Sequence, residues 1–251
     1  MTLLKRLGNK QAIAKDIYPL FPKHDMYIEL FFGAGGMFFR KPKVKHNIMN
    51  DIDGDIYNLF NVLKTRKDEL IEAMIITPIH DKLWDNWKAN QEDDDIWKAV
   101  RFLYLSNLGF MCQPMTMVVG TRDRWTLTIN LIEKTYEKIK AVQFLCDDYR
   151  KVLDRLEYAN SIPFIYADPP YINTGSNYTH DDWTEEDSIE LFDVLCNSGY
   201  NFAMSEFDND FIVKEAKGRG LIITDIGSRQ NLRKRRNEIL ITNYQIQRTL
   251  F

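Results

Sequence analysis

The chain has 251 residues, of which 45 % are hydrophobic and 27 % charged. These values are typical of a soluble globular protein with one elaborated domain or two small ones. No apolar run reaches the ~18–20 residues that a membrane span needs, and the first residues do not form the apolar region of a signal peptide. The net charge of −3 excludes a polycation, although residues 219–236 hold five arginines and one lysine against one aspartate. That segment is either a solvated face or a surface for a polyanion.

The three cysteines, Cys112, Cys146 and Cys196, are widely spaced and form no CxxC pair. This pattern argues against a disulfide framework or a zinc site and favours a reducing cytoplasm. The four histidines do not cluster with the cysteines. We therefore expect no metal site.

The hydrophobic pattern predicts alternating strands and helices at both ends of the chain. An apolar run over 26–32 predicts a buried strand that ends at Gly33, a second strand covers 45–50, and helical spacing follows over 55–66. The same alternation resumes after the middle of the chain. The later strands are predicted at 142–146, 164–167, 201–205, 221–224 and 238–242, and the later helices at 149–159 and 185–196.

The middle region, 67–135, loses this alternation. Residues 69–76 and 96–105 have helical spacing, whereas 114–125 is typical of a loop or a hairpin. We therefore predict an α/β domain formed by 1–66 and 136–251, with a mostly parallel sheet and helices on both faces, and a small inserted subdomain between them.

The first motif, Phe31-Phe32-Gly33-Ala34-Gly35, places glycines directly after a predicted strand. Glycine permits a sharp turn with positive φ and the close approach of a ligand, and ligands of open parallel sheets gather at the carboxyl ends of strands. Asp51 ends the next predicted strand, where a carboxylate can accept hydrogen bonds from ribose hydroxyls. Alone, the pattern also fits a plain turn, and it lacks the third glycine of a dinucleotide fingerprint.

The second motif, Asp168-Pro169-Pro170-Tyr171, follows a buried strand and is more specific. Two prolines end the strand and remove two backbone donors, so the neighbouring carbonyls are left to accept hydrogen bonds. A carboxylate, a rigid carbonyl and an aromatic ring then surround one small volume. This set suits a planar base with an exocyclic amine, whereas the simpler interpretation is a strand end with a core tyrosine.

In this order, the motifs resemble those of Dam-type DNA adenine-N6 methyltransferases, which depend on S-adenosyl-L-methionine. Gly8-Asn9-Lys10-Gln11 resembles the N-terminal lysine motif of that family, residues 31–35 its FxGxG motif, and 168–171 its DPPY motif. Asn50-Asp51-Ile52 matches the acidic end of the family's second strand, and residues 238–244 resemble a late strand. The resemblance spans almost the whole chain and implies a Rossmann-like methyltransferase fold with a target-recognition insert at 67–135.

The resemblance implies a set of cofactor contacts. Lys10, Asp51 and Asp168 would contact S-adenosyl-L-methionine, with Asp51 on the ribose hydroxyls. Asp147 or Asp148 lies where the family often contacts the cofactor's adenine, and we assign that role to Asp148. Arg6 replaces a family aromatic that also contacts the cofactor, so one contact near the methionine part is altered. The glycine motif supplies the other contacts, from Phe31, Phe32, Gly33, Ala34 and Gly35.

The resemblance also implies the reaction, methyl transfer to N6 of an adenine flipped out of double-stranded DNA in a bacterial or phage-infected cell. Hydrogen bonds from the amine to Asp168 and to the Pro169 carbonyl would localise its lone pair, and the base would stack on Tyr171. Residues 106–125 lie where the family reads sequence, with Asn107, Arg122 and Arg124 as candidates. The phosphate-contact candidates are Arg229, Arg233, Lys234, Arg235 and Arg236.

Two other classes of function remain open at this stage. A relative that methylates an RNA base or a protein glutamine usually has Asn where this chain has Asp168. A DNA-binding homologue without turnover is favoured only by Arg6. The recognition sequence, for which GATC is the prior, and the oligomeric state are not indicated by the sequence.

Overall fold

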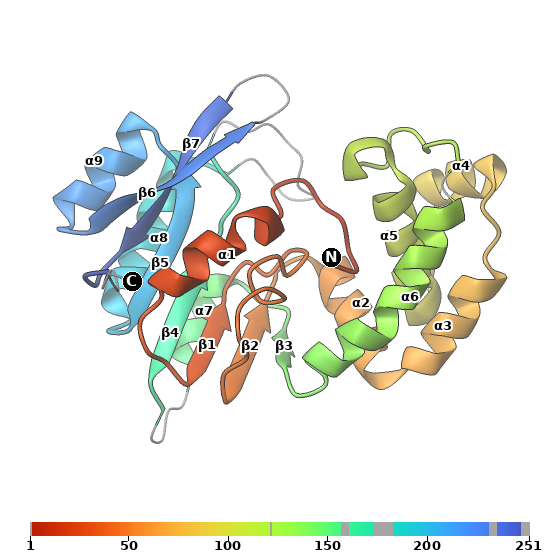
Figure 1. Ribbon diagram of the computed structural model, residues 1–251, viewed down its shortest axis with the longest axis horizontal. Coiled ribbons are helices and arrows are strands. Elements are labelled where there is room, and N and C mark those ends of the chain that lie inside the picture. Colours follow the sequence, from red (N-terminus) through yellow and green to blue (C-terminus); the bar gives the residue numbers. More distant parts are fainter. Residues whose placement is uncertain (1, 121, 157–160, 173–182, 231–234, 247–251) are drawn as a thin grey trace.

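The computed structural model describes residues 2–120, 122–156, 161–172, 183–230 and 235–246 (Figure 1). A seven-stranded sheet has the order β3-β2-β1-β4-β5-β7-β6, in which β7 runs antiparallel to β5 and β6 and the other neighbouring strands are parallel. The predicted mostly parallel α/β fold is therefore confirmed. The strands are β1 (Met26–Glu29), β2 (His46–Asn50), β3 (Gln143–Leu145), β4 (Pro163–Ala167), β5 (Asn201–Phe207), β6 (Ile222–Gln230) and β7 (Arg235–Thr242).

Helices cover both faces of the sheet, because its parallel strands bury side chains on both sides. On β1, Tyr27 faces one core with α2 (Gly54–Thr65) and the helices of the middle region. Its neighbour Ile28 faces a second core with α7 (Tyr149–Asp154), α8 (Glu185–Asn197) and α9 (Asp210–Gly218). The chain before β1 forms η1 (Lys10–Ala12), α1 (Ala14–Ile17) and η2 (Tyr18–Leu20).

The middle region is helical, as predicted, but it holds more helix than the sequence indicated. Figure 1 shows it beside the sheet as a bundle of α3 (Lys67–Ile76), α4 (Asp81–Ala89), α5 (Asp95–Leu108) and α6 (Arg122–Ile139). A 3-10 turn, η3 (Phe110–Cys112), follows α5. The predicted boundary at residue 135 falls inside α6, and the bundle shares one continuous core with α2 and the sheet.

The expected loop or hairpin over 114–125 is wrong at its end, because α6 begins at Arg122. The buried side of α6 includes Trp125, Ile132 and Ile139, seven residues apart, with two threonines between them. Thr128 and Thr135 hide their hydroxyls by donating to the carbonyls of the residues four positions earlier. The hydrophobic pattern does not count threonine as apolar, so these two positions interrupt the apolar face of the helix in the sequence.

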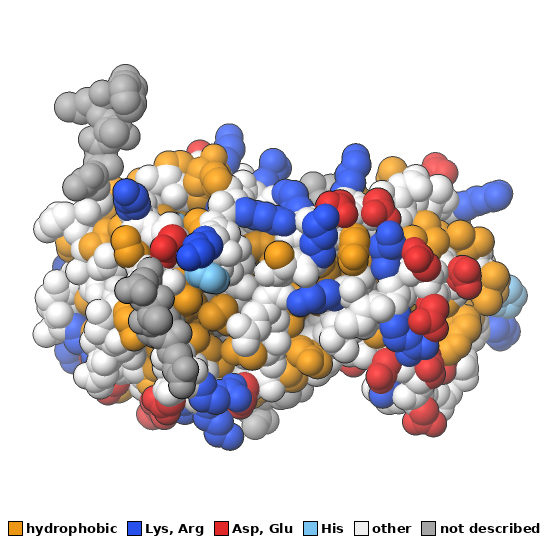
Figure 2. Space-filling view, turned by 90° about the horizontal axis from the view of Figure 1, so that it is seen from below, with side chains coloured by type: hydrophobic (Ala, Val, Ile, Leu, Met, Phe, Trp, Pro, Cys, Tyr) orange, Lys and Arg blue, Asp and Glu red, His pale blue; other side chains and the backbone are white. Residues whose placement is uncertain are grey.

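Charge is unevenly distributed over the surface. Figure 2 shows acidic side chains gathered over the helical bundle, while lysines and arginines spread across the middle of the same face. The acidic stretch 81–95 belongs to the bundle, and its Asp81, Asp85, Asp93, Asp94 and Asp95 are all exposed. Among the described residues, no helix is long and apolar enough to cross a membrane, and no three His, Cys, Asp or Glu side chains are grouped to hold a metal ion.

Candidate active site

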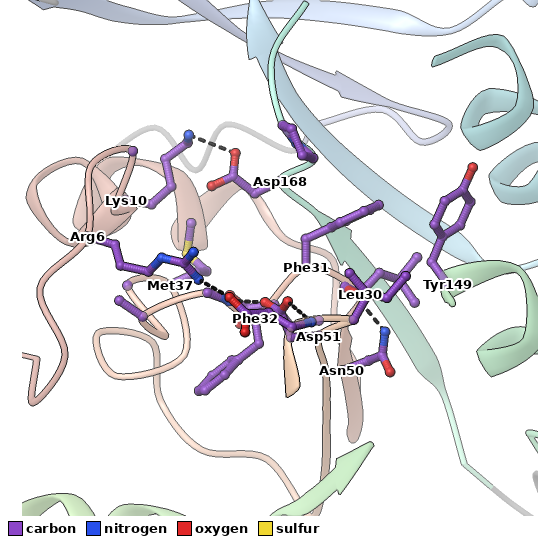
Figure 3. A pocket seen from close by; sticks show the side chains of 18 of the residues that line it. Arg6, Lys10, Leu30, Phe31, Phe32, Met37, Asn50, Asp51, Tyr149 and Asp168 are labelled. Carbon is purple, nitrogen blue, oxygen red and sulfur yellow. Dashed lines mark hydrogen bonds and ion pairs between the residues drawn. The ribbon is translucent and has the colours of Figure 1, made fainter. Parts of the chain in front are cut away.

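A pocket opens where β1, β2 and β4 end and brings both sequence motifs together (Figure 3). Its wall includes the N-terminal segment, the glycine turn, the end of β2 and the start of α7. Carboxyl ends of parallel strands meet at one edge of a sheet, so residues far apart in the chain converge there. The predicted residues that line it are Arg6, Lys10, Phe31, Phe32, Gly33, Ala34, Asp51, Asp148, Asp168 and Pro170.

The glycine turn holds three glycines, Gly33, Gly35 and Gly36, that no other residue could replace without strain. Gly33 has φ of +53°, and its amide donates to Asp51 Oδ2 at 2.6 Å. The same carboxylate accepts from the Asp53 amide at 3.0 Å, so Asp51 is fixed at the pocket wall. A Cβ on Gly36 would overlap the side chain of Asn9, which means that this glycine lets the N-terminal segment approach the turn.

Lys10 connects the two functional ends of the second motif. Its ammonium is 3 % exposed, lies 2.8 Å from Asp168 Oδ1 (Figure 3) and also donates to the hydroxyl of Tyr171. Glu238 Oε1 of β7 is 3.8 Å away. The ammonium of Lys10 already binds Asp168 and Tyr171. The predicted contact of Lys10 with the cofactor would be made in addition to these two bonds.

Arg6 pairs with an acid of the pocket rather than standing free. Its guanidinium lies 3.1 Å from Asp53 Oδ2, two residues beyond Asp51 (Figure 3). Burial raises the pKa of Asp51, and Arg6 and the backbone amides of Asp53 and Gly33 act against that rise. The residue that replaces the family's aromatic thus offsets part of the negative charge at the end of β2.

Glu29 is a site residue that the sequence reading missed, because it lies at the end of an apolar run that was read as core. It lines the pocket at 2 % exposure, and Tyr27 donates to its Oε2 at 2.9 Å. Burial raises the pKa of the Glu29 carboxyl to about 8, and the charges of Asp168 and Asp51 add to the rise. Glu29 is therefore one of six carboxyl residues that line the pocket, with Asp51, Asp53, Asp147, Asp148 and Asp168, and this set suits a cationic ligand.

An aromatic group closes the other end of the pocket. The ring of Phe31 lies 5.3 Å from that of Tyr149 and 5.6 Å, edge-on, from that of Trp183. Asp148 caps α7 through the Arg150 amide and pairs with the Arg150 guanidinium at 2.7 Å, so the acid predicted to contact the cofactor is held in place. This end suits a flat ring system beside a hydrogen-bond acceptor.

Comparison with known proteins agrees with this geometry. A family model described as D12 class N6 adenine-specific DNA methyltransferase matches residues 7–225. The chain belongs to this family. Membership implies S-adenosyl-L-methionine as the methyl donor.

Several curated relatives are DNA adenine methylases. That of Vibrio cholerae is 27 % identical over 216 residues, which cover 76 % of this chain and 74 % of the relative. That of Escherichia coli K12 is 27 % identical over 196 residues, covering 70 % and 67 %, and the retron Ec67 enzyme is 26 % identical over 228 residues, covering 84 % and 79 %. Among solved structures, Trm5b of Pyrococcus abyssi aligns over 95 % of this chain and 49 % of its own at 11 % identity, with a TM-score of only 0.38.

One arginine of the basic segment, Arg236, lies near the second motif of the methyltransferase. In the register of the paired strands β6 and β7, the backbone of Arg229 is opposite that of Arg236. The Arg236 guanidinium lies 5.3 Å from the ring of Phe207. Phe207 in turn packs edge-on against Tyr171, with ring centroids 4.5 Å apart. Arg235 also belongs to β7, while Arg233 and Lys234 lie outside the described residues.

The predicted DNA role of Asn107 is wrong, because the structure buries this side chain. It is 1 % exposed, its Oδ1 accepts from the Lys5 amide at 3.0 Å, and its Nδ2 donates to the Leu3 carbonyl and to Thr128. Asn107 therefore anchors the N-terminal segment to α5 and α6. No sequence pattern predicts these bonds, because all three partners are more than 20 residues away along the chain.

Arg122 and Arg124, in contrast, are exposed at the start of α6. Beside them, residues 109–118 form a short hairpin held by an isolated bridge between Gly109 and Met117. Its surface is apolar: Phe110 is 61 % exposed and Met115 71 %.

Proposed function

We propose that this methyltransferase transfers a methyl group from S-adenosyl-L-methionine to N6 of an adenine flipped out of double-stranded DNA. One observation carries the proposal: Asp168 lines the same pocket as the glycine turn. Its Oδ1 lies 2.8 Å from the buried ammonium of Lys10, which also donates to Tyr171. A methyl donor in the pocket and an amine at Asp168 would therefore meet at one point.

The chain's own groups fit the methyl donor. S-adenosyl-L-methionine supplies an electrophilic methyl group on a sulfonium when it is bound. Glu29 and Asp51 provide negative charge for its cationic groups, and Asp51 keeps lone pairs for ribose hydroxyls at the turn. The rings of Phe31, Tyr149 and Trp183 bound the space for its adenine, beside Asp148. Arg6 and Lys10 also line the pocket and would supply positive charge for the methionine carboxylate.

The second motif deals with the target amine. Lys10 and Ser205 both bond to Oδ1 of Asp168, and no interaction among the described residues uses Oδ2. Oδ2 and the carbonyl of Pro169 can then accept the two N–H groups of the amine, which localises its lone pair for attack on the methyl group. The carboxylate also stabilises the positive charge that develops on nitrogen. The ring of Tyr171 supports the extruded base.

The helical bundle and strands β6 and β7 would hold the duplex. Arg122 and Arg124 can contact phosphates or guanine edges, and Phe110 and Met115 can fill the gap that a flipped base leaves. On the other side, the ring of Phe207 lies between Arg236 and Tyr171 and contacts both. Basic groups on both sides of a base pocket favour DNA over a protein substrate.

The test is transfer of tritiated methyl from S-adenosyl-L-methionine to unmethylated bacterial DNA, followed by digestion and separation of nucleosides. Label in N6-methyladenine supports the proposal, and Asp168→Ala run beside the wild type controls for a contaminating enzyme. Label in RNA or protein alone, with none in DNA, would replace the proposed substrate. Cofactor binding without any transfer would favour the binding homologue instead.

A further inference from the structure

Three oxygen atoms form a line through the buried face of β4 and β5 and end at Asp168. The hydroxyl oxygen of Tyr166 lies 2.9 Å from Ser205 Oγ, and Ser205 Oγ donates to Asp168 Oδ1 at 2.9 Å. Tyr166 and Ser205 are both completely buried, so no water competes for these bonds. The sequence reading identified neither residue.

Strand register explains why these three side chains meet. β4 and β5 are parallel, with Tyr166 opposite Ala203 and Ala167 opposite Met204, which brings Asp168 level with Ser205. Side chains two positions apart on a strand share a face, so Tyr166 and Asp168 point the same way. Ser205, on the neighbouring strand, fills the space between them.

The proton positions in the line follow from simple accounting. An ionised carboxylate is an acceptor only, so the single proton of Ser205 is directed to Asp168. The lone pair of Ser205 then accepts the proton of Tyr166. Burial, followed by the charge of Asp168, raises the pKa of Tyr166 well above its usual range, so its phenol remains a donor.

We propose that Ser205, supported by Tyr166, is the positioning residue of the methyl-transfer reaction. It fixes the rotation of the Asp168 carboxylate so that Oδ1 is held by the sheet and Oδ2 is presented to the target amine. This inference rests on the proposed function, because it concerns how Asp168 meets that amine.

Lys10 alone is a poorer guide for the carboxylate. Its ammonium is divided between Asp168, Tyr171 and, at 3.8 Å, Glu238, and it arrives on a 3-10 turn of the N-terminal segment. Any ligand that changes one of these contacts changes the others. The hydroxyls of Tyr166 and Ser205 belong to the central strands β4 and β5. They therefore orient the Asp168 carboxylate in the same way whether or not ligands are bound.

The test compares single-turnover methyl transfer with the dissociation constants of S-adenosyl-L-methionine and DNA, measured separately for each variant. For Ser205→Ala we expect the transfer rate constant to fall about a hundredfold, as for a misplaced reacting group, while both dissociation constants stay within about threefold of wild type. Ser205→Thr keeps the hydroxyl and should recover to within about tenfold of wild type.

A double-mutant cycle separates positioning from a general loss of packing. Tyr166→Phe alone should cost about threefold to tenfold, because Ser205 still donates to Asp168. In the Ser205→Ala background the same change should cost nothing more, because the line is already broken. The matched control is Thr242→Val, which removes another completely buried hydroxyl of the sheet, one that donates to the Tyr244 carbonyl instead.

Three outcomes would overturn the inference. They are a Ser205→Ala rate within threefold of wild type, an equal loss in Thr242→Val, and losses from Ser205 and Tyr166 that simply add. If the wild type itself transfers no methyl to DNA, the proposed function fails and the inference fails with it. An active wild type with an active Ser205→Ala variant removes the inference alone.

Discussion

The sheet and the helical bundle of this methyltransferase fix their polar side chains in different ways. In the sheet, Asp51 and Asp168 stand at the ends of parallel strands, and the backbone and neighbouring strands hold them facing one pocket. In the bundle, Asn107 forms hydrogen bonds that connect the helices to the N-terminal segment. The exposed Arg122 and Arg124 lie at the start of α6. Reaction chemistry is thus tied to topology, whereas recognition depends on surface residues that topology does not constrain.

The largest effect should come from the sheet side of this contrast. Asp168→Ala removes the acceptor for the target amine and the partner of Lys10, so we expect methyl transfer to fall about a thousandfold or more. Single-turnover kinetics would measure it. Asp154→Ala, at an exposed carboxylate at the end of α7, is the control and should keep wild-type turnover. Near-normal transfer by the Asp168 variant would refute the mechanism.

Tyr171 allows the ring and the hydroxyl to be tested apart. Tyr171→Ala loses base stacking, about 1–3 kcal/mol, together with the bond from Lys10, so turnover should fall about a hundredfold. Tyr171→Phe keeps the ring and loses only that bond, and we expect about a fivefold loss. Fluorescence of 2-aminopurine at the target position would show whether the alanine variant fails to hold the extruded base. Equal losses in both variants would mean that the ring does not support the base.

On the bundle side, Asn107→Ala should change stability instead of chemistry. The buried side chain makes three hydrogen bonds, and its loss leaves the Lys5 amide and the Leu3 carbonyl without their partner. We expect the free energy of unfolding to fall by about 2–3 kcal/mol, measured by urea denaturation. At a temperature where the variant is folded, its DNA affinity should match that of wild type, and a selective loss of DNA affinity would restore the role predicted from sequence.

The same contrast explains which residues of the site could be predicted from the sequence. Asp51, the glycine turn and Asp168 were predicted because each follows a strand signal, and parallel strands must end at one edge. Glu29 and Ser205 were missed because each is a single polar residue within an apolar run, and such a run predicts a buried strand of the core. Helix α6 was missed because Thr128 and Thr135 bury their hydroxyls against its own backbone. Asn107 was misassigned because its partners come from segments that only the folded chain brings together.

Cofactor binding should depend on pH through Glu29. With a pKa of about 8 in the free protein, this carboxyl is mostly protonated at neutral pH. A cation beside it favours the ionised form, so binding releases a proton, and affinity should rise with pH by up to about tenfold per unit until it levels off near pH 8. Calorimetry in buffers of different ionisation enthalpy would count the proton. Glu29→Gln keeps an acceptor for Tyr27 and should flatten the profile, so an unchanged slope in that variant would assign the titration to another group.

The smallest effects should come from the exposed arginines of the bundle. If Arg122 and Arg124 contact phosphates, each alanine variant should weaken DNA binding a few-fold at any sequence and reduce the slope of log K against log salt by about 0.9. If either reads a guanine instead, the loss should be confined to the target sequence, because base contacts specify and phosphate contacts position. Lys151→Ala, at an exposed lysine of α7, is the control and should alter neither quantity. Unchanged affinity and slope in both arginine variants would move the DNA interface away from the start of α6 and leave the β6–β7 hairpin as its principal basic surface.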